Sequence, residues 1–249
     1  VLLVDTFNTM DGIDNAIIVA KELESYGKKL LGIRIDSGDL AYLSKKARSK
    51  LKKNGLEYVK IIASNDLDEF LIESLKNQNS KISVWGIGTR LVTAFDNPSL
   101  GAVYKMTSMK NSDGIWNKKI KLSEQKIKIN NPGINQVYRY SKDGLFRGDM
   151  IYDINDNVNE IKMIDPNDST RHKTFDNKYS KEKLLVGIFK SGKLIYKKPD
   201  LNKIKFRLRD DLNMLDESHK RLKNPHSYPV GIEENLFIEK KEMILKLRK

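Results

Sequence analysis

Polar residues and glycines gather directly after four apolar stretches in the first hundred residues of the chain. They are Asp5 and Thr6; Arg34, Asp36, Ser37 and Gly38; Ser64, Asn65 and Asp66; and Gly86, Gly88 and Thr89. Carboxylates accept hydrogen bonds from hydroxyl groups, arginine binds anions, and backbone N–H groups at glycine-rich turns bind phosphate. A phosphorylated ribose needs all three kinds of contact. The set therefore predicts a phosphosugar site, with Asp36 and Arg34 as candidate catalytic residues and the others as candidate substrate-binding residues.

Arg34 and Asp36 stand out because charged residues are rarely placed in buried strands without a partner or a task. They alternate along one predicted strand, so both side chains face the same way. The alternative to a binding role is a structural salt bridge between the two side chains.

The other loops also have a purely structural interpretation. Ser37 and the run Ser64-Asn65-Asp66 stand where the N-caps of helices are expected. Gly86-Ile87-Gly88-Thr89 carries two glycines at a spacing of two, which is a weak signal by itself, and would form a phosphate nest at the start of a helix. Binding is favoured because all four loops are polar or glycine-rich.

The elements that position these loops follow from the apolar periodicity. Strands are predicted at 1–5, 29–36, 58–64 and 81–86, with a possible fifth at 101–107, and a helix follows each of the first four. Strands joined by single helices pair in parallel, so their carboxyl ends meet at the edge where α/β proteins bind ligands. Periodicity leaves open whether they form an open doubly wound sheet or part of an eight-stranded barrel.

After residue 105 the alternation of apolar strands and helices gives way to short alternating strands with turn signals. We therefore expect a β/α segment at 1–105 and a smaller β-rich α/β portion at 106–249. The predicted elements of the second portion are, in order, short strands up to 156 with turns at Asp113-Gly114 and Asp143-Gly144, a polar loop at 157–180, a hairpin at 184–196 turning at Ser191-Gly192, a helix at 200–223 and an extended connector at 224–230.

Composition restricts the class of protein. The net charge is +13, and residues 106–249 carry +11 of it, as 31 Lys+Arg against 20 Asp+Glu. This excess is scattered lysine without an RNP-like motif or a basic tract, so nucleic acid is disfavoured as a partner. The chain has no cysteine and no apolar run near the roughly 20 residues that span a bilayer, so we expect no disulfide, no membrane partner and, by default, a cytoplasmic location.

The three histidines, His172, His219 and His226, lie far downstream of the polar loops. They are predicted to be surface residues, because no His, Asp and Glu cluster has metal-ligand spacing. No metal site is therefore expected in this chain.

Six segments, in this order, resemble nicotinate phosphoribosyltransferase. They are VLLVDTFNT, GIRIDSGDLAYLSKKAR, IIASNDLDE, GIGTRLVTAFDNPSLGAVYKM, KLSEQKIKINNPGINQVYR and RLKNPHSYPV. The most specific parts are IRIDSGDL, SNDLDE and GIGTRLVT. The resemblance covers residues 1–150 and returns at 221–230, and the stretch between is less distinctive.

The resemblance implies an irregular α/β barrel joined to a second α/β domain, in a homodimer whose active sites form at the interface. It implies that nicotinate and phosphoribosyl pyrophosphate give nicotinate mononucleotide and pyrophosphate in NAD biosynthesis, with ATP hydrolysis and Mg²⁺ and no tightly bound cofactor. By match to the family motifs, Arg34 and Asp36 would bind the pyridine and ribose side, residues 64–66 the sugar, and Gly86, Gly88 and Thr89 the 5′-phosphate.

Two departures from the family pattern matter. The family usually carries Tyr-Asp where Phe7-Asn8 stands, and no histidine here lies in the motif that family members phosphorylate, which precedes the VDT strand. With Val1 already inside a predicted strand, we expect the later part of a longer enzyme, inactive by itself. The alternatives are a nicotinamide- or quinolinate-type phosphoribosyltransferase, or a non-catalytic basic module that binds nucleic acid.

Overall fold

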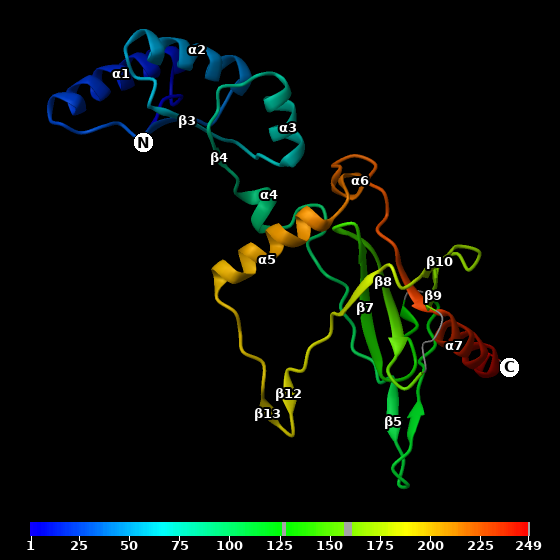
Figure 1. The fold of residues 1–249 in the computed structure, drawn as a ribbon. Helices are drawn as coiled ribbons and strands as arrows, with labels where there is room; N and C mark the ends of the chain where they lie inside the picture. The colour runs from blue at the N-terminus through cyan, green and yellow to red at the C-terminus, as the bar shows by residue number, and fades with distance from the viewer. Residues whose placement is uncertain (126–127, 157–160, 249) are drawn as a thin grey trace. The chain divides into compact units, whose positions relative to one another are not determined.

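The structure is a computed structural model that describes residues 1–125, 128–156 and 161–248. It divides into two compact units, Val1–Ala102 and Val103–Lys249 (Figure 1). The first is built of alternating strands and helices and the second is rich in antiparallel strands. The α/β class with parallel strands, expected from the sequence, is confirmed.

The first unit is a parallel sheet of four strands in the order β1-β2-β3-β4. Its elements are β1 (Leu2–Leu3), α1 (Thr9–Ser25), β2 (Gly32–Ile35), α2 (Leu40–Lys53), β3 (Lys60–Ser64), α3 (Glu69–Asn77), β4 (Val84–Gly86) and α4 (Thr89–Val92). The four predicted strands are confirmed, each shorter than the apolar run that indicated it. Because neighbours in sequence are neighbours in the sheet, the four loops that follow the strands lie along one edge.

The core of the first unit explains why the polar loops can be exposed. Ile33 and Ile35 of β2 and Ile61 and Ala63 of β3 are almost fully buried beneath α1 and α2. Gly12 lets α1 approach β1, because a methyl group there would collide with the carbonyl oxygen of Val4. These buried apolar side chains stabilise the sheet, so the polar residues at the strand ends do not have to contribute to the core.

The predicted fifth strand at 101–107 is wrong. These residues form neither helix nor strand, and the side chains of Val103 and Tyr104 are exposed. The apolar run has the composition of a strand, but β4 is the last strand of its sheet and this segment joins none of the sheets of the described residues; the carbonyl oxygen of its last residue, Thr107, accepts isolated hydrogen bonds from Lys119 N and Gly133 N. Strand composition without a pairing partner is not enough to make a strand.

The second unit contains a six-stranded sheet in the order β10-β9-β14-β8-β7-β11, and only β14 and β8 pair in parallel. Its elements are β5 (Ser108–Lys110), β6 (Trp116–Lys118), β7 (Asn135–Lys142), β8 (Leu145–Asp153), β9 (Ile161–Ile164), β10 (His172–Phe175), β11 (Ser180–Lys183), β12 (Phe189–Lys190), β13 (Lys193–Leu194), α5 (Leu201–Met214), α6 (Glu217–Lys220), β14 (Val230–Glu233) and α7 (Glu234–Leu247). Strands β5 and β6 form one hairpin, and β12 and β13 another.

Three turns are as predicted. Positive φ angles at Asp143 and Gly144, at Ser191 and Gly192, and at Gly114 mark the tight turns of three hairpins. In the predicted connector, residues 225–229 form neither helix nor strand and Asn224 has a positive φ angle of 47°; Tyr228 fixes this segment by donating a hydrogen bond of 2.9 Å to Asp149 Oδ1.

Two predictions for the second unit need correction. The polar loop predicted at 157–180 contains β9, β10 and the start of β11, while its first residues, 157–160, lie outside the described part of the chain. The helix predicted at 200–223 is interrupted, because Leu215 is extended and Asp216 starts a new turn by accepting a hydrogen bond from Ser218 N.

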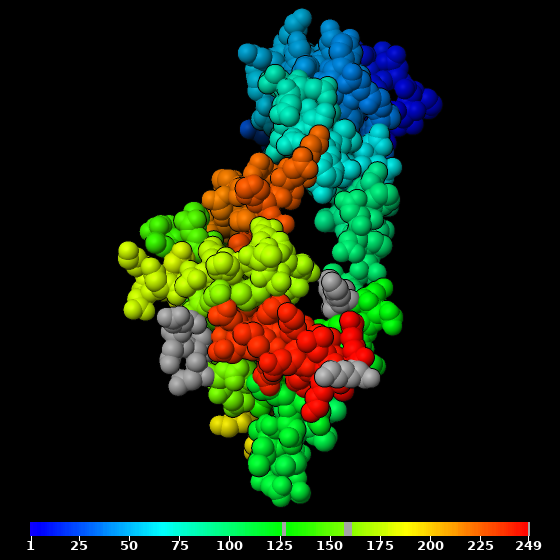
Figure 2. All heavy atoms as spheres, turned by 90° about the vertical axis from the view of Figure 1, so that its right-hand side faces the viewer, coloured from blue at the N-terminus to red at the C-terminus, as the bar shows by residue number. Residues whose placement is uncertain are grey.

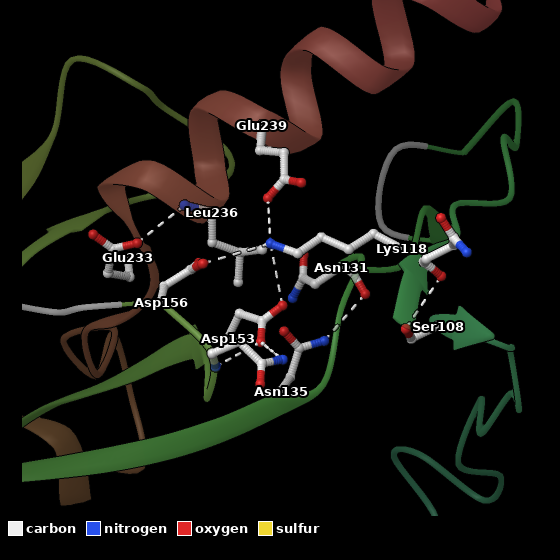
Figure 3. Close-up of polar contacts among 11 residues, drawn as sticks. Ser108, Lys118, Asn131, Asn135, Asp153, Asp156, Glu233, Leu236 and Glu239 are labelled. Atoms are coloured by element: carbon white, nitrogen blue, oxygen red, sulfur yellow. Dashed lines mark hydrogen bonds and ion pairs between the residues drawn. The ribbon is translucent and has the colours of Figure 1, made fainter. Parts of the chain in front are cut away.

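A lysine joins three parts of the second unit (Figure 3). Lys118 of β6 lies 3.2 Å from Asp153 Oδ2 at the end of β8, 3.7 Å from Asp156 Oδ1 and 2.6 Å from Glu239 Oε2 of α7. The Asp153 side chain is fully buried. The ammonium therefore neutralises a buried carboxylate and fixes the first hairpin to the sheet and to the last helix.

Candidate functional site

Asp5 joins the loops that follow β1 and β2. Its Oδ2 atom accepts a 2.7 Å hydrogen bond from the backbone N–H of Asp36 and a 2.8 Å hydrogen bond from the hydroxyl of Ser37. These three predicted site residues are thus brought together, although 31 residues separate Asp5 from Asp36. Asp5 fixes the position of the backbone from which the Asp36 side chain extends.

The capping interpretation of the serine loops does not hold. The N-cap of α2 is Asp39, whose Oδ1 accepts a hydrogen bond from Tyr42 N, and the N-cap of α3 is Asp68, which accepts one from Leu71 N. Ser37 and Ser64 each precede the true cap by a few residues. A role in helix capping therefore does not explain why these residues stand at the strand ends.

The loop after β3 has an unusual backbone. Asn65 and Asp66 have φ angles of 142° and 40°, in the region that favours glycine. Such conformations cost about 1–3 kcal/mol per residue and are concentrated at binding sites. Among the described residues the buried hydroxyl of Ser64 has no hydrogen-bond partner. The strained loop thus directly follows a strand residue, Ser64, whose buried hydroxyl has no partner among the described residues.

The loop after β4 lies beside the same hydroxyl. Gly86 pairs with Ser64 across the sheet, and a methyl group on Gly86 would lie 3.2 Å from Ser64 Cβ. Gly88 and Thr89 are exposed, and a methyl group on Gly88 would meet no atom within 4 Å. The helix that follows, α4, is a single turn, so a phosphate here would depend on backbone N–H groups more than on a helix dipole.

Arg34 and Asp36 are both exposed to solvent, in contrast to the expectation of charges in a buried strand. Among the described residues no ion pair joins them, so the structural salt bridge is not observed. Thr6 is exposed beside Asp5, and Gly38 has a φ angle of +76° that a side chain would strain. No hydrogen bond between described residues joins the loop after β2 to the loop after β3.

Sequence reasoning missed a contact that fixes the last two loops together. Arg90 NH1 lies 3.9 Å from Asp68 Oδ2, and the same guanidinium lies 3.9 Å from the centre of the Phe95 ring. Asp68 therefore caps α3 and holds the residue that follows Thr89. The signal was present in SNDLDE and GTRL, where Asp68 stands two positions after Asp66 and Arg90 directly follows Thr89.

Asn8 shows what one departure from the family pattern does locally. Its Oδ1 atom accepts hydrogen bonds of 2.8 and 3.2 Å from Met10 N and Asp11 N and so caps α1. Asparagine and aspartate cap helices about equally well, so this exchange keeps the start of α1. The Phe7 side chain is 97% exposed and has no hydroxyl to offer.

The histidines lie in the second unit, away from the four loops in sequence. His172 and His226 are exposed as predicted, whereas His219 is half-buried and its Nδ1 lies 2.7 Å from the carbonyl oxygen of His226. The described residues contain no group of three or more side chains that could hold a metal ion. Within the same residues no helix has the length and apolar character needed to cross a bilayer.

Known proteins that are similar to this chain belong to the family that its sequence motifs resemble. The sequence model of the "Nicotinate phosphoribosyltransferase (NAPRTase) family" matches residues 4–131, and that of the "Nicotinate phosphoribosyltransferase C-terminal domain" matches residues 134–240. Nicotinate phosphoribosyltransferase of Bacillus subtilis is 42% identical over 252 residues, covering 98% of this chain and 50% of the relative. The enzyme of Dictyostelium discoideum is 36% identical over 256 residues, covering 95% and 43%.

A solved structure shows the same fold. The crystal structure of human nicotinic acid phosphoribosyltransferase matches with a TM-score of 0.71 at 24% identity, covering 99% of this chain and 46% of that one. The chain thus spans about half the length of the relatives it matches. On the strength of the two family matches, which together extend over both units, the chain belongs to the nicotinate phosphoribosyltransferase family.

Proposed function

We propose that this chain supplies the phosphoribosyl-binding part of a nicotinate phosphoribosyltransferase that acts in NAD biosynthesis. The whole enzyme would join the ring nitrogen of nicotinate to C1 of phosphoribosyl pyrophosphate and release pyrophosphate. The relatives carry this activity in their names, and the chain shares their family. The observation that carries the proposal is the row of four polar loops at one edge of the parallel sheet, with helix capping assigned to Asp39 and Asp68.

Each loop has a role that follows from its chemistry. The Asp36 carboxylate would accept hydrogen bonds from the ribose hydroxyls, and the Arg34 guanidinium would bind the anionic side of the pyridine or the phosphates. The Ser64 hydroxyl would gain the partner that it lacks in the chain alone. Backbone N–H groups between Gly86 and Thr89 would bind the 5′-phosphate.

The reaction needs positioning more than proton transfer. The bond from the pyridine nitrogen to C1 forms as the bond from C1 to the pyrophosphate oxygen breaks, and positive charge develops on the sugar. An enzyme accelerates such a step by fixing both reactants and by stabilising the developing charge. Asp36 would serve both purposes, because a carboxylate that binds the hydroxyls also faces the cationic ribose.

We also propose that the enzyme uses ATP hydrolysis and Mg²⁺, works as a homodimer with its active site at the interface, and is cytoplasmic. ATP hydrolysis, Mg²⁺ and the homodimer come from the family resemblance, and the cytoplasmic location is the default expectation from the sequence. The described residues contain no group of three or more His, Asp or Glu side chains that could hold a metal ion by themselves, and none of the roles above involves Mg²⁺.

Steady-state kinetics of Asp36→Ala in the full-length enzyme test the proposal. Loss of the contact to the ribose hydroxyls should lower kcat/KM for phosphoribosyl pyrophosphate by about 100-fold or more. The matched control is Glu73→Ala, which removes an exposed carboxylate from α3. It should leave kcat/KM unchanged.

A loss below about tenfold in Asp36→Ala, equivalent to roughly 1.4 kcal/mol, would contradict the role of this carboxylate. Assays with nicotinate and with nicotinamide as acceptor show which pyridine the enzyme uses. A preference for nicotinamide would contradict nicotinate as the proposed substrate, and it would not contradict the proposed sugar site.

A further inference from the structure

The second unit contains a cavity of about 500 Å³ between its last helix and its sheet. Ile151 of β8 and Ile232 of β14 line it from the sheet, and Phe237 and Ile244 line it from α7. Figure 2 shows α7, in red, on the surface of this unit. Sites for small organic ligands typically have volumes of roughly 300–1,000 Å³ and mostly apolar walls. The size and lining of this cavity agree with that class.

The charges of the lining have one sign. Lys240, Lys241 and Arg248 line the cavity together with the apolar residues, and the described lining includes no aspartate or glutamate. By contrast, Glu239, one position before Lys240, pairs with Lys118 and does not line the cavity. An anionic group inside the cavity would therefore meet three cations and no repelling carboxylate.

Lys240 is held in place by neutral acceptors. Its ammonium donates hydrogen bonds of 2.8 Å to Asn131 Oδ1 and 3.2 Å to the carbonyl oxygen of Ile129. An ammonium has three N–H donors, so two acceptors leave one N–H for a further partner. Burial lowers the pKa of Lys240, and a bound anion would oppose this shift.

We propose that this cavity binds a small organic carboxylate with an apolar body, with the carboxylate on Lys240 and the body between α7 and the sheet. Apolar contact with Ile232 and Ile244 would give most of the binding free energy, and the charge would select anions over neutral molecules of the same shape. The proposal concerns residues of the second unit alone and does not depend on the proposed reaction.

Three probes test the proposal in the full-length protein. Octanoate has the apolar body and the carboxylate, 1-octanol has the body alone, and acetate has the charge alone. Binding is measured by titration calorimetry and by the NMR shifts of isoleucine methyl groups. Octanoate should saturate one site and shift the methyl signals of Ile232 and Ile244 but not those of Ile13 in the first unit. 1-Octanol and acetate should bind at least tenfold more weakly.

Two variants complete the test. Lys240→Met keeps the length of the side chain without the charge and should weaken octanoate binding at least tenfold. Lys246→Met makes the same change on α7 outside the cavity lining and should leave binding unchanged. Any one of four results would overturn the proposal. They are binding of 1-octanol as tight as that of octanoate, binding of acetate as tight as that of octanoate, unmoved methyl signals, and full octanoate affinity in Lys240→Met. The comparison of probes needs no variant, so it decides even if Lys240→Met fails to fold.

Discussion

At the scale of single residues, Asp5 shows how one carboxylate oxygen can hold two neighbouring loops together. It is half-buried, whereas Asp36 and Ser37, which both donate to it, are exposed. The sequence placed Asp5 correctly at a strand end but gave no sign that it binds the neighbouring loop. This contact depends on the pairing of β1 with β2, which a one-dimensional pattern does not contain.

Replacing Asp5 should affect both stability and substrate binding. Asp5→Ala removes the acceptor of two hydrogen bonds and should lower the free energy of unfolding by about 1–2 kcal/mol. It should also raise KM for phosphoribosyl pyrophosphate, because the Asp36 backbone loses its fixed position. Urea denaturation and steady-state kinetics measure the two effects. Asp5→Asn keeps an acceptor oxygen and should lose less, and an Asp5→Ala protein equal to wild type in both assays would show that the contact is unimportant.

Tyr140 carries a buried hydroxyl that is expected to reduce stability. Its ring is buried and stacks at 3.9 Å on Phe175, but among the described residues its hydroxyl has no hydrogen-bond partner. Tyr140→Phe should therefore raise the free energy of unfolding by about 1 kcal/mol. Tyr228→Phe, which removes a bonded hydroxyl, should lower it.

The difference in the free energy of unfolding between Tyr140→Phe and the wild type also depends on pH. Burial raises the pKa of Tyr140 above its ordinary value of 10.0, so the unfolded chain releases the proton first as pH rises. The stability of the wild type therefore falls above pH 10, and the advantage of Tyr140→Phe should grow there. Thermal unfolding at a series of alkaline pH values measures this difference, and a gap that shrinks above pH 10 would refute the assignment.

At the scale of elements, the sequence predicts the helices and strands that have a repeating apolar pattern. It misses the strands that depend on pairing with a neighbouring strand. The apolar stripes of α1 and α2 and the runs of β2 and β3 could be read directly, because both kinds of element are buried on one face or two. Strand β11 could not, because Ser180–Lys183 is exposed along its whole length and is held only by pairing with β7. The predicted strand at 101–107 failed for the opposite reason, since it lacks a partner.

The loop after β4 allows a test that separates binding from folding. A methyl group on Gly88 would meet no atom within 4 Å, but its φ and ψ angles of −117° and −101° lie outside the regions that residues with a side chain favour. Gly88→Ala should therefore still fold, with a melting temperature a few degrees below that of the wild type because of backbone strain. If the 5′-phosphate binds to this loop, the new methyl group should raise KM for phosphoribosyl pyrophosphate about tenfold or more.

Gly101→Ala is the matched control for Gly88→Ala, because Gly101 also has open space around its Cα. It should change neither the melting temperature nor KM. A Gly88→Ala enzyme with an unchanged KM would mean that the phosphate binds elsewhere.

At the scale of the whole molecule, each unit has a core of its own. In the second unit, the Lys118 cluster (Lys118 with Asp153, Asp156 and Glu239) shows what a single charge contributes to stability. Nothing in the sequence indicates this cluster. Lys118 and Glu239 are separated by 121 residues, and nothing in their local sequence distinguishes them from other surface charges. The positions of the polar strand ends could be predicted because these residues lie in short motifs directly after apolar runs.

Removing the lysine should be costly for the second unit. Lys118→Met would leave the Asp153 carboxylate buried without its cation and should lower the free energy of unfolding by about 3–5 kcal/mol. Adding Asp153→Asn should restore part of the loss, and Lys110→Met, which removes an exposed lysine of β5, should have little effect. Chemical denaturation measures all three variants, and a Lys118→Met protein as stable as Lys110→Met would disprove the role of the cluster.

The central claim is that the loops after four neighbouring strands together hold a phosphorylated ribose. A crystal structure of the full-length protein with ribose 5-phosphate bound tests it directly. We predict that the sugar hydroxyls contact the Asp36 carboxylate and that the phosphate accepts hydrogen bonds from backbone N–H groups between Gly86 and Thr89. Ribose 5-phosphate bound at another place, with these loops vacant, would contradict the account.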